Sequence, residues 1–313
     1  MRENKMNRPL LSIVIANYNY GRFLDEAIKS VISQDMGDKV QLIICDAAST
    51  DNSVEIIKKY ANGLPPNTSL YDWEPGNSQL TTKDYRLSTK ITWWCSEPDG
   101  GQGAAFNKGF ARAKGRFLTW LNADDVMLPG TVERLSRSVL RHPSCRWFVG
   151  GVMWLDEGMH VIKCGRGRPF SRLRFKAGDV SVWGPSSFFE KTLLDEVGGV
   201  DERFHYTMDT DLWLRFARKA HARYLPFAKY AWGLRIHAAS KMGGQNCEGS
   251  PLRDPNHPKW AQLKREVEWK RSYYTPIRNT KFLRLLSISW LGALGGLLDT
   301  IRFRGKGIDQ VVS

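Results

Sequence analysis

Continuous apolar runs alternate with helical patterns along the first half of the chain. Four of these runs are rich in branched and aromatic side chains, at residues 10–16, 40–45, 91–95 and 117–121. Runs of this length and composition are typical of strands that are covered on both faces. Between them, apolar residues recur at helical spacing, as in residues 23–31. This alternation predicts an α/β fold with a mostly parallel central sheet and helices on both faces.

The second half of the chain has a less regular pattern. Residues 147–154 predict a strand, residues 182–190 an interrupted pair of strands, and residues 209–220 an amphipathic helix. Two polar stretches without periodicity, residues 63–90 and 243–258, predict surface loops. The first is long enough to count as an insertion.

A third pattern lies near the end of the sequence. Six apolar side chains recur there at helical intervals: Leu283, Leu286, Trp290, Leu294, Leu297 and Ile301. They predict an amphipathic helical tail over residues 280–304, flanked by lysine and arginine. A basic helix that carries tryptophan can lie in a membrane interface, and the alternative is a helix packed on the domain or on a partner chain. The stretch is too short, and too often interrupted by glycine, to span a bilayer.

The composition of the chain indicates an anionic partner. The 313 residues carry a net charge of +14, which favours nucleic acid, an acidic membrane surface or phosphorylated substrates. The five cysteines are widely spaced and form no CxxC pair, so neither a disulfide framework nor a zinc site is indicated. With no apolar signal segment at the N-terminus, we expect a cytoplasmic protein, either free or peripheral on the cytoplasmic face of the membrane.

Carboxylates follow the predicted strands where ligands bind in open α/β sheets. Asp46 ends the second strand, and the adjacent pair Asp124 and Asp125 follows the fourth. Two neighbouring carboxylates stay ionised together only if they are solvated or share a cation. The pair therefore indicates either an exposed acidic turn or a divalent-metal site that could hold the phosphates of a nucleotide.

Seven segments occur in an order that carries a family resemblance: SIVIANYN, CDAASTDNS, SEPDGGQGAAFNKGF, GRFLTWLNADDVMLPG, GPSSFFEKTLLDEVGGVDE, MDTDLWLR and RIHAASK. Over residues 10–241 this order resembles the inverting family 2 glycosyltransferases of the GT-A fold, of the bacterial surface-polysaccharide type. Each motif is weak alone, but their order is specific.

The resemblance implies an enzyme that moves a sugar, a hexose or an N-acetylhexosamine, from a nucleotide-sugar donor to an acceptor hydroxyl. A UDP-sugar donor, a glycan or lipid-linked acceptor and Mg²⁺ or Mn²⁺ are expected. A GT-A domain would occupy residues 1–242, divided into a nucleotide-sugar-binding half (9–142) and an acceptor half (143–242). Residues 243–279 would form a loop and linker.

The resemblance also implies roles for residues on the nucleoside side of the donor. Asp46 would accept a hydrogen bond from the base, with Asn17 and Tyr18 beside it. Alanine at both positions after Asp46, where the family usually has Gly-Ser, leaves the base less certain. Asp99 and Gln102, before a predicted helix, would lie near the donor sugar or nucleoside.

The remaining roles concern the diphosphate and the reaction. Asp125, in the DXD-type motif, would ligate the metal and Asp124 would contact the ribose or the sugar. His237 would reach the metal or the diphosphate, and Arg235 would pair with phosphate oxygens. Asp209 would act as the catalytic base that takes the acceptor proton, with Asp211 as the alternative carboxylate.

Two classes of protein other than a glycosyltransferase fit part of the sequence. A non-catalytic basic binding protein would suit the charge, but the positive residues are scattered and no nucleic-acid-binding motif is present. A sugar-nucleotide-forming nucleotidyltransferase would need a glycine-rich phosphate loop after the first strand. The sequence there is Asn17-Tyr18-Asn19-Tyr20-Gly21-Arg22, which argues against that activity. We expect no nucleic-acid partner.

Overall fold

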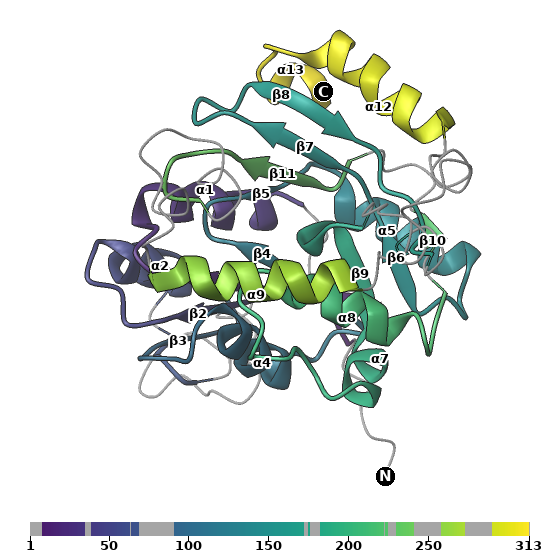
Figure 1. Ribbon diagram of the computed structural model, residues 1–313. Helices are drawn as coiled ribbons and strands as arrows, with labels where there is room; N and C mark the ends of the chain where they lie inside the picture. The colour runs from purple at the N-terminus through teal and green to yellow at the C-terminus, as the bar shows by residue number, and fades with distance from the viewer. Residues whose placement is uncertain are drawn as a thin grey trace.

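The protein is built around a seven-stranded sheet (Figure 1). The computed structural model describes residues 8–34, 39–62, 64–68, 91–171, 175, 182–221, 223–224, 230–240, 258–272 and 290–312. Across the sheet the strands are β10 (Arg223–Tyr224), β6 (Trp147–Val149), β9 (Ser187–Glu190), β4 (Phe117–Asn122), β1 (Leu11–Asn17), β2 (Val40–Asp46) and β3 (Trp93–Ser96).

The sheet is mostly parallel, as the sequence predicts. Strand β1 pairs in parallel with β2 and β4, and β2 pairs in parallel with β3. Strand β9 alone in this sheet runs antiparallel, to both β4 and β6. Because the parallel strands end at one edge, Asn17, Asp46 and Ser96 lie in register there.

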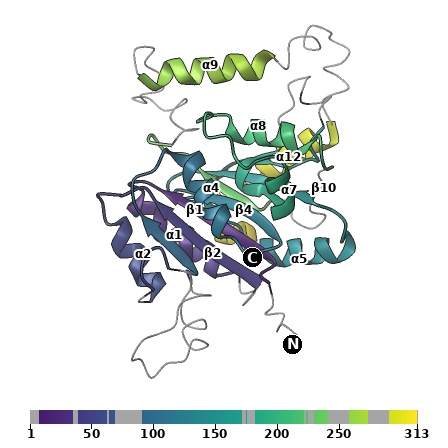
Figure 2. The ribbon, with the colours of Figure 1, turned by 90° about the horizontal axis from the view of Figure 1, so that it is seen from below.

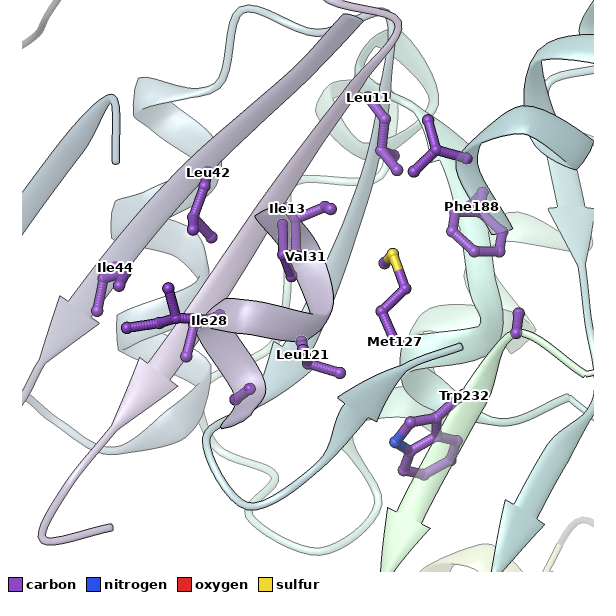
Figure 3. Close-up of a cluster of buried hydrophobic side chains, with 14 of the residues drawn as sticks. Leu11, Ile13, Ile28, Val31, Leu42, Ile44, Leu121, Met127, Phe188 and Trp232 are labelled. Carbon is purple, nitrogen blue, oxygen red and sulfur yellow. The ribbon is translucent and has the colours of Figure 1, made fainter. Parts of the chain in front are cut away.

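Helices cover both faces of the sheet, which confirms the expected layering. One face carries α1 (Gly21–Ile32), α2 (Ser53–Ala61) and α5 (Thr131–Arg141), and the other carries α4 (Gln102–Arg112), α7 (Lys191–Glu196) and α8 (Met208–Phe216). Successive residues of a strand point to opposite faces of the sheet. Ile13 therefore packs in one core cluster and Val14 in the other. Figure 3 shows Ile13 and Leu42 on the side that α1 covers with Ile28 and Val31.

A second, four-stranded sheet was not expected from the sequence. It consists of β5 (Val126–Met127), β11 (Trp232–Arg235), β7 (Val152–Leu155) and β8 (Val161–Gly165). The single strand predicted for residues 147–154 is wrong, because the chain leaves the main sheet at Gly150-Gly151 and enters the second one. The pair predicted for residues 182–190 is also wrong. That segment is the 3-10 turn η2 (Gly184–Ser186) followed by β9.

Within the described residues, the helices that follow the two sheets are α9 (Pro258–Ser272), α12 (Trp290–Phe303) and α13 (Asp309–Val312). Helix α12 packs against β8, where a Cβ added to Gly296 would lie 3.1 Å from the carbonyl oxygen of Cys164. Helix α9 falls inside the segment expected to be loop and linker. Its charged sequence has no apolar stripe that could have revealed it.

Several expectations fall on residues outside the described ranges. They are most of the insertion at 63–90, the loop at 243–257, and the first part of the tail, residues 280–289. Within the described ranges, no helix combines the length and the apolar character needed to cross a bilayer.

Candidate active site

A buried carboxylate organises the ends of β1, β2 and β3. Asp46 is 1% exposed. Its Oδ1 accepts hydrogen bonds from Asn17 Nδ2 (2.6 Å) and Ser49 Oγ (2.5 Å). Its Oδ2 accepts from the Ser49 backbone N–H (3.0 Å) and from Ser96 Oγ (2.6 Å). Four donors therefore hold this carboxylate in place, which a buried acidic group requires.

Asn17 leaves one acceptor open beside Asp46. Its amide nitrogen faces Asp46 and Ser49, so its Oδ1 is fixed on the other side, buried and without a partner among the described residues. An unpaired buried acceptor is costly unless a ligand supplies a donor.

Tyr18, the next residue along the chain, is 59% exposed. Ala48 has φ 56°, a left-handed conformation that favours glycine.

A second carboxylate group lies where β4 ends. Asp125 is 1% exposed. Its Oδ1 accepts from the Arg235 backbone N–H (2.9 Å) and its Oδ2 from Asn122 Nδ2 (2.7 Å). Burial, and then the neighbouring Asp124, raise the pKa of Asp125 well above its usual value. Gln102 Nε2 donates to Asn122 Oδ1 (2.7 Å), so Gln102 supports the same turn through Asn122.

His237 is locked between a carboxylate and a guanidinium. Its Nδ1 lies 3.2 Å from an Arg22 nitrogen, and its Nε2 lies 3.1 Å from Asp124 Oδ2. Because a guanidinium only donates, Nδ1 accepts and Nε2–H donates to Asp124. The ring is buried against Phe23, with 4.7 Å between ring centroids. The contact therefore joins His237 to Asp124 as a hydrogen-bonded pair.

Arg235 is less available to a phosphate than its sequence position suggests. Its side chain is 3% exposed, forms an ion pair with Glu26, and lies over the Phe23 ring at 4.4 Å. Arg22 is the cation nearer to solvent, with 56% of its side chain exposed. Sequence reasoning missed Arg22; its signal is a basic residue in the first turn of a helix that follows a strand end.

Asp99 shapes the loop before α4. Its Oδ1 accepts from the Gly101 backbone N–H at 2.8 Å, and Gly101 has φ 109°, which suits glycine. Asp99 thus holds the turn that brings Gln102 to Asn122. Gln102 therefore lies next to the turn that carries Asp124 and Asp125, and Asp99 stabilises the loop before α4.

Asp209 and Asp211 sit in the first turn of α8, and their surroundings differ. Asp209 Oδ1 accepts from the Thr210 backbone N–H at 2.6 Å. Burial raises the pKa of Asp209, and the Lys270 ammonium opposes that rise. Asp211 instead pairs with Arg215 at 2.6 Å, and Arg215 also donates to the Val197 carbonyl. Asp211 is thus committed to a structural ion pair, while Asp209 makes no ion pair with the described residues.

The residues around Asp125 suit a hard divalent cation. Two adjacent carboxylates are ligands that Mg²⁺ and Mn²⁺ accept, and such ions also take substrate phosphates as ligands. Burial first, and then the Asp124 carboxylate, raise the pKa of Asp125, and a bound cation would favour its ionised form. In the part of the chain that the structure describes, no three acidic, histidine or cysteine side chains already form a metal cage.

Comparison with known proteins extends the family resemblance. The chain matches the Glycosyl transferase family 2 description over residues 12–75 and 94–183. An uncharacterized glycosyltransferase of Rickettsia prowazekii is 26% identical over 70% of this chain and 61% of its own length. One from Mycobacterium tuberculosis is 29% identical over 67% of this chain and 69% of its own. One from a Nostoc strain is 34% identical, but the match spans 31% of that relative's length.

Solved structures share the architecture at low sequence identity. S. aureus TarS 1-349 in complex with UDP-GlcNAc has a TM-score of 0.55 and 16% identity, over 88% of this chain and 69% of that one. The Pyrobaculum calidifontis mannosyltransferase PcManGT, in complex with GDP-Man and Mn²⁺, has a TM-score of 0.50 and 14% identity, over 93% of this chain and 76% of that one. These likenesses show the fold, which is of the GT-A type. The family match, together with the ordered motifs, shows that the chain belongs to glycosyltransferase family 2.

Proposed function

We propose that this glycosyltransferase moves a sugar from a UDP-sugar to an acceptor hydroxyl with inversion at the anomeric carbon. The acceptor would be a glycan or a lipid-linked glycan in surface-polysaccharide synthesis. The observation that carries the proposal is that three carboxylates have different surroundings. Asp46 accepts hydrogen bonds from four protein donors. Asp125 is buried beside Asp124, and both effects raise its pKa. Asp209 is the carboxylate of its helix that makes no ion pair with the described residues.

Asn17 and Asp46 would receive the base of the donor. The open Oδ1 of Asn17 can accept an N–H from a nucleobase, while Asp46 keeps the Asn17 amide in the orientation that exposes that oxygen. Uracil offers one such N–H. TarS is described with UDP-GlcNAc and PcManGT with GDP-Man, so relatives of this fold hold either base.

Asp125, with Asp124 beside it, would hold Mg²⁺ or Mn²⁺, and His237 would support Asp124. When bound, the cation offsets the negative charge that builds up on the departing nucleoside diphosphate. The chain's own contribution is to aim Asp125 through the Arg235 backbone N–H and Asn122. These two donors favour the ionised carboxylate, whereas burial and Asp124 oppose it. The pair of Asp124 and His237 fixes the other carboxylate of the turn.

Asp209 would act on the acceptor. It would remove the proton from the acceptor hydroxyl while that oxygen forms a bond to the anomeric carbon and the bond to the diphosphate breaks. One displacement of this kind inverts the anomeric configuration and leaves no covalent sugar on the protein. The raised pKa of Asp209 makes it a better base than an exposed aspartate.

Replacing Asp209 by Asn tests this role, and Asp211→Asn is its matched control on the same helix turn. We expect Asp209→Asn to lower donor-dependent transfer by about 10²–10⁴-fold, because the amide cannot take the proton. Asp211→Asn should keep most of the activity and lose mainly stability. Transfer by Asp209→Asn at the wild-type rate would refute Asp209 as the base, and a retained anomeric configuration in the product would refute the single displacement.

A membrane partner is supported by the outward face of α12. Leu297, Leu298 and Ile301 are 56%, 55% and 71% exposed on that face. The opposite face is anchored to the domain, since Asp299 pairs with Arg166 at 2.8 Å and accepts from the Tyr230 hydroxyl.

Positive charge surrounds this apolar face. Arg302, Arg304, Lys306 and Lys163 are exposed, and none of them forms an ion pair with a described carboxylate. Apolar side chains rimmed by cations suit the surface of an anionic bilayer. We therefore assign α12 to a peripheral contact with the cytoplasmic face of a membrane, where a lipid-linked acceptor would be presented.

A further inference from the structure

A carboxylate of α9 is buried against the chain segment that leads into α8. Glu266 is 5% exposed. Its Oε1 accepts from the His205 backbone N–H (2.8 Å) and from Gln262 Nε2 (3.0 Å). Its Oε2 accepts from the backbone N–H groups of Tyr206 (2.7 Å) and Thr207 (2.9 Å), and from Thr207 Oγ1 (3.1 Å). One side chain thus gathers three successive backbone donors and a hydroxyl.

These donors belong to the three residues that immediately precede the helix that carries Asp209. Helix α8 begins at Met208, its N-cap residue is Thr207, and the Thr207 side chain makes no capping hydrogen bond to the helix. The first N–H groups of a helix, from the N-cap onward, have no partner within it and carry partial positive charge. Glu266 supplies a partner for the Thr207 N–H from a helix about 60 residues further along the chain. It therefore fixes the backbone two residues before Asp209.

Helix α9 contacts the same region through two further side chains. The rings of Trp269 and Phe204 pack with centroids 4.5 Å apart, just before the segment that Glu266 binds. Lys270 lies one helical turn after Glu266 and acts on Asp209. In both views of the ribbon, α9 lies on the side of the molecule where α8 begins (Figures 1 and 2).

We propose that Glu266 is a positioning residue for the reaction, and that α9 is the element that aims Asp209 at the acceptor. The inference rests on the proposed function, because it assigns Asp209 the role of base. Asp209 can accept a proton in line with the attack only if α8 starts at a fixed place and angle. A misplacement of about 1 Å at a reacting group can cost a factor of about 10² in rate.

The kinetic test compares Glu266→Ala with Glu268→Ala, an exposed glutamate on the same helix. We expect Glu266→Ala to lower kcat by about 10–100-fold while the KM for the nucleotide sugar stays within about twofold, because the donor side does not involve α9. Glu266→Gln keeps one acceptor oxygen but turns an amide donor toward a backbone N–H. Its kcat should therefore fall between that of the wild type and that of Glu266→Ala. Glu268→Ala should match the wild type.

An unchanged kcat in a folded Glu266→Ala protein would overturn the proposal. So would an equal loss of donor affinity and kcat, since that would indicate a general structural role. If Glu266→Ala does not fold, the Glu266→Gln protein decides the question by the same two numbers.

Hydrogen exchange separates this inference from the proposed function. In Glu266→Ala, the amides of Tyr206 and Thr207 should exchange at least about tenfold faster than in the wild type, whereas amides of α4 should be unaffected. Unchanged exchange at Tyr206 and Thr207 would overturn the positioning role whether or not the chain transfers sugar. If Glu266→Ala shows this faster exchange but the wild-type chain transfers no sugar from any nucleotide, the proposed function is refuted and the contact between Glu266 and the backbone stands.

Discussion

At the scale of single residues, the ionisation of Asp209 links structure to reaction rate. Burial raises its pKa above the ordinary 3.8, and the Lys270 ammonium on α9 opposes the rise. Only the ionised carboxylate can take a proton, so transfer should fall as the pH drops through this raised pKa. Lys270 is the charged side chain among the described residues that acts on Asp209.

Replacing Lys270 by Gln should therefore move the acid limb of the pH–rate profile to higher pH. The shift follows because the ammonium favours the ionised form, and its removal leaves the effect of burial unopposed. The measurement is kcat as a function of pH for both proteins at saturating donor. A limb that stays in place, or that moves to lower pH, would show that Lys270 does not act on the base.

The same carboxylate has a cost for folding. Its pKa is raised in the folded state, so above the unfolded value of about 3.9 the ionised group favours unfolding. Asp209→Asn keeps an oxygen that can accept from the Thr210 N–H and removes that charge. The variant that loses transfer should therefore melt above the wild type at pH 7.

The sequence could predict the carboxylates but not the groups that hold them. Asp46, Asp125 and Asp209 stand in recognisable motifs at strand or helix ends. Their partners, such as Ser96 and Glu266, come from distant segments whose local sequence carries no sign of the contact. Arg235 shows the same limit, because its ion pair with Glu26 depends on a helix that only the fold brings near.

At the scale of elements, periodicity predicted the strands that are buried on both faces to within one or two residues. The prediction for residues 117–121, for example, corresponds to β4 (Phe117–Asn122). It failed where the pattern carries less information. Strand β8 has two adjacent exposed residues, Ile162 and Lys163, in place of alternation, and α9 has no apolar face.

Gly115 has a packing role that its local sequence does not reveal. Helix α4 ends earlier, at Arg112. A Cβ at Gly115 would lie 2.6 Å from the backbone nitrogen of Ser12, so the residue allows two segments to pack closely.

The outward face of α12 provides the prediction at this scale. Replacing both Leu297 and Ile301 by Asp should weaken binding to anionic vesicles at least about tenfold, because it removes apolar area and adds repulsion. Leu140→Asp is the matched control, since Leu140 is 79% exposed on α5. Sedimentation with anionic and zwitterionic vesicles measures the effect. Equal binding by the double variant and the control would contradict a membrane role for α12.

At the scale of the whole molecule, the fold places charge where an anionic donor and an anionic surface would meet it. The net charge of +14 predicted an anionic partner without saying which. Among the described residues, Arg22 lies beside His237 on the donor side, and Lys163, Arg302, Arg304 and Lys306 are exposed around α12. The central claim is that a nucleotide sugar binds at the carboxyl edge of the sheet together with a cation at Asp125.

Thermal unfolding with a panel of nucleotide sugars tests that claim most directly. At about 100 times the Kd, a bound donor should contribute about 2.7 kcal/mol, which corresponds to a rise of about 5–10 °C in Tm. We predict this rise for one UDP-sugar in the presence of Mn²⁺ or Mg²⁺, its loss with EDTA, and its loss in Asp125→Asn but not in the surface control Asp195→Asn. No rise with any nucleotide sugar, or a full rise in Asp125→Asn, would contradict the account.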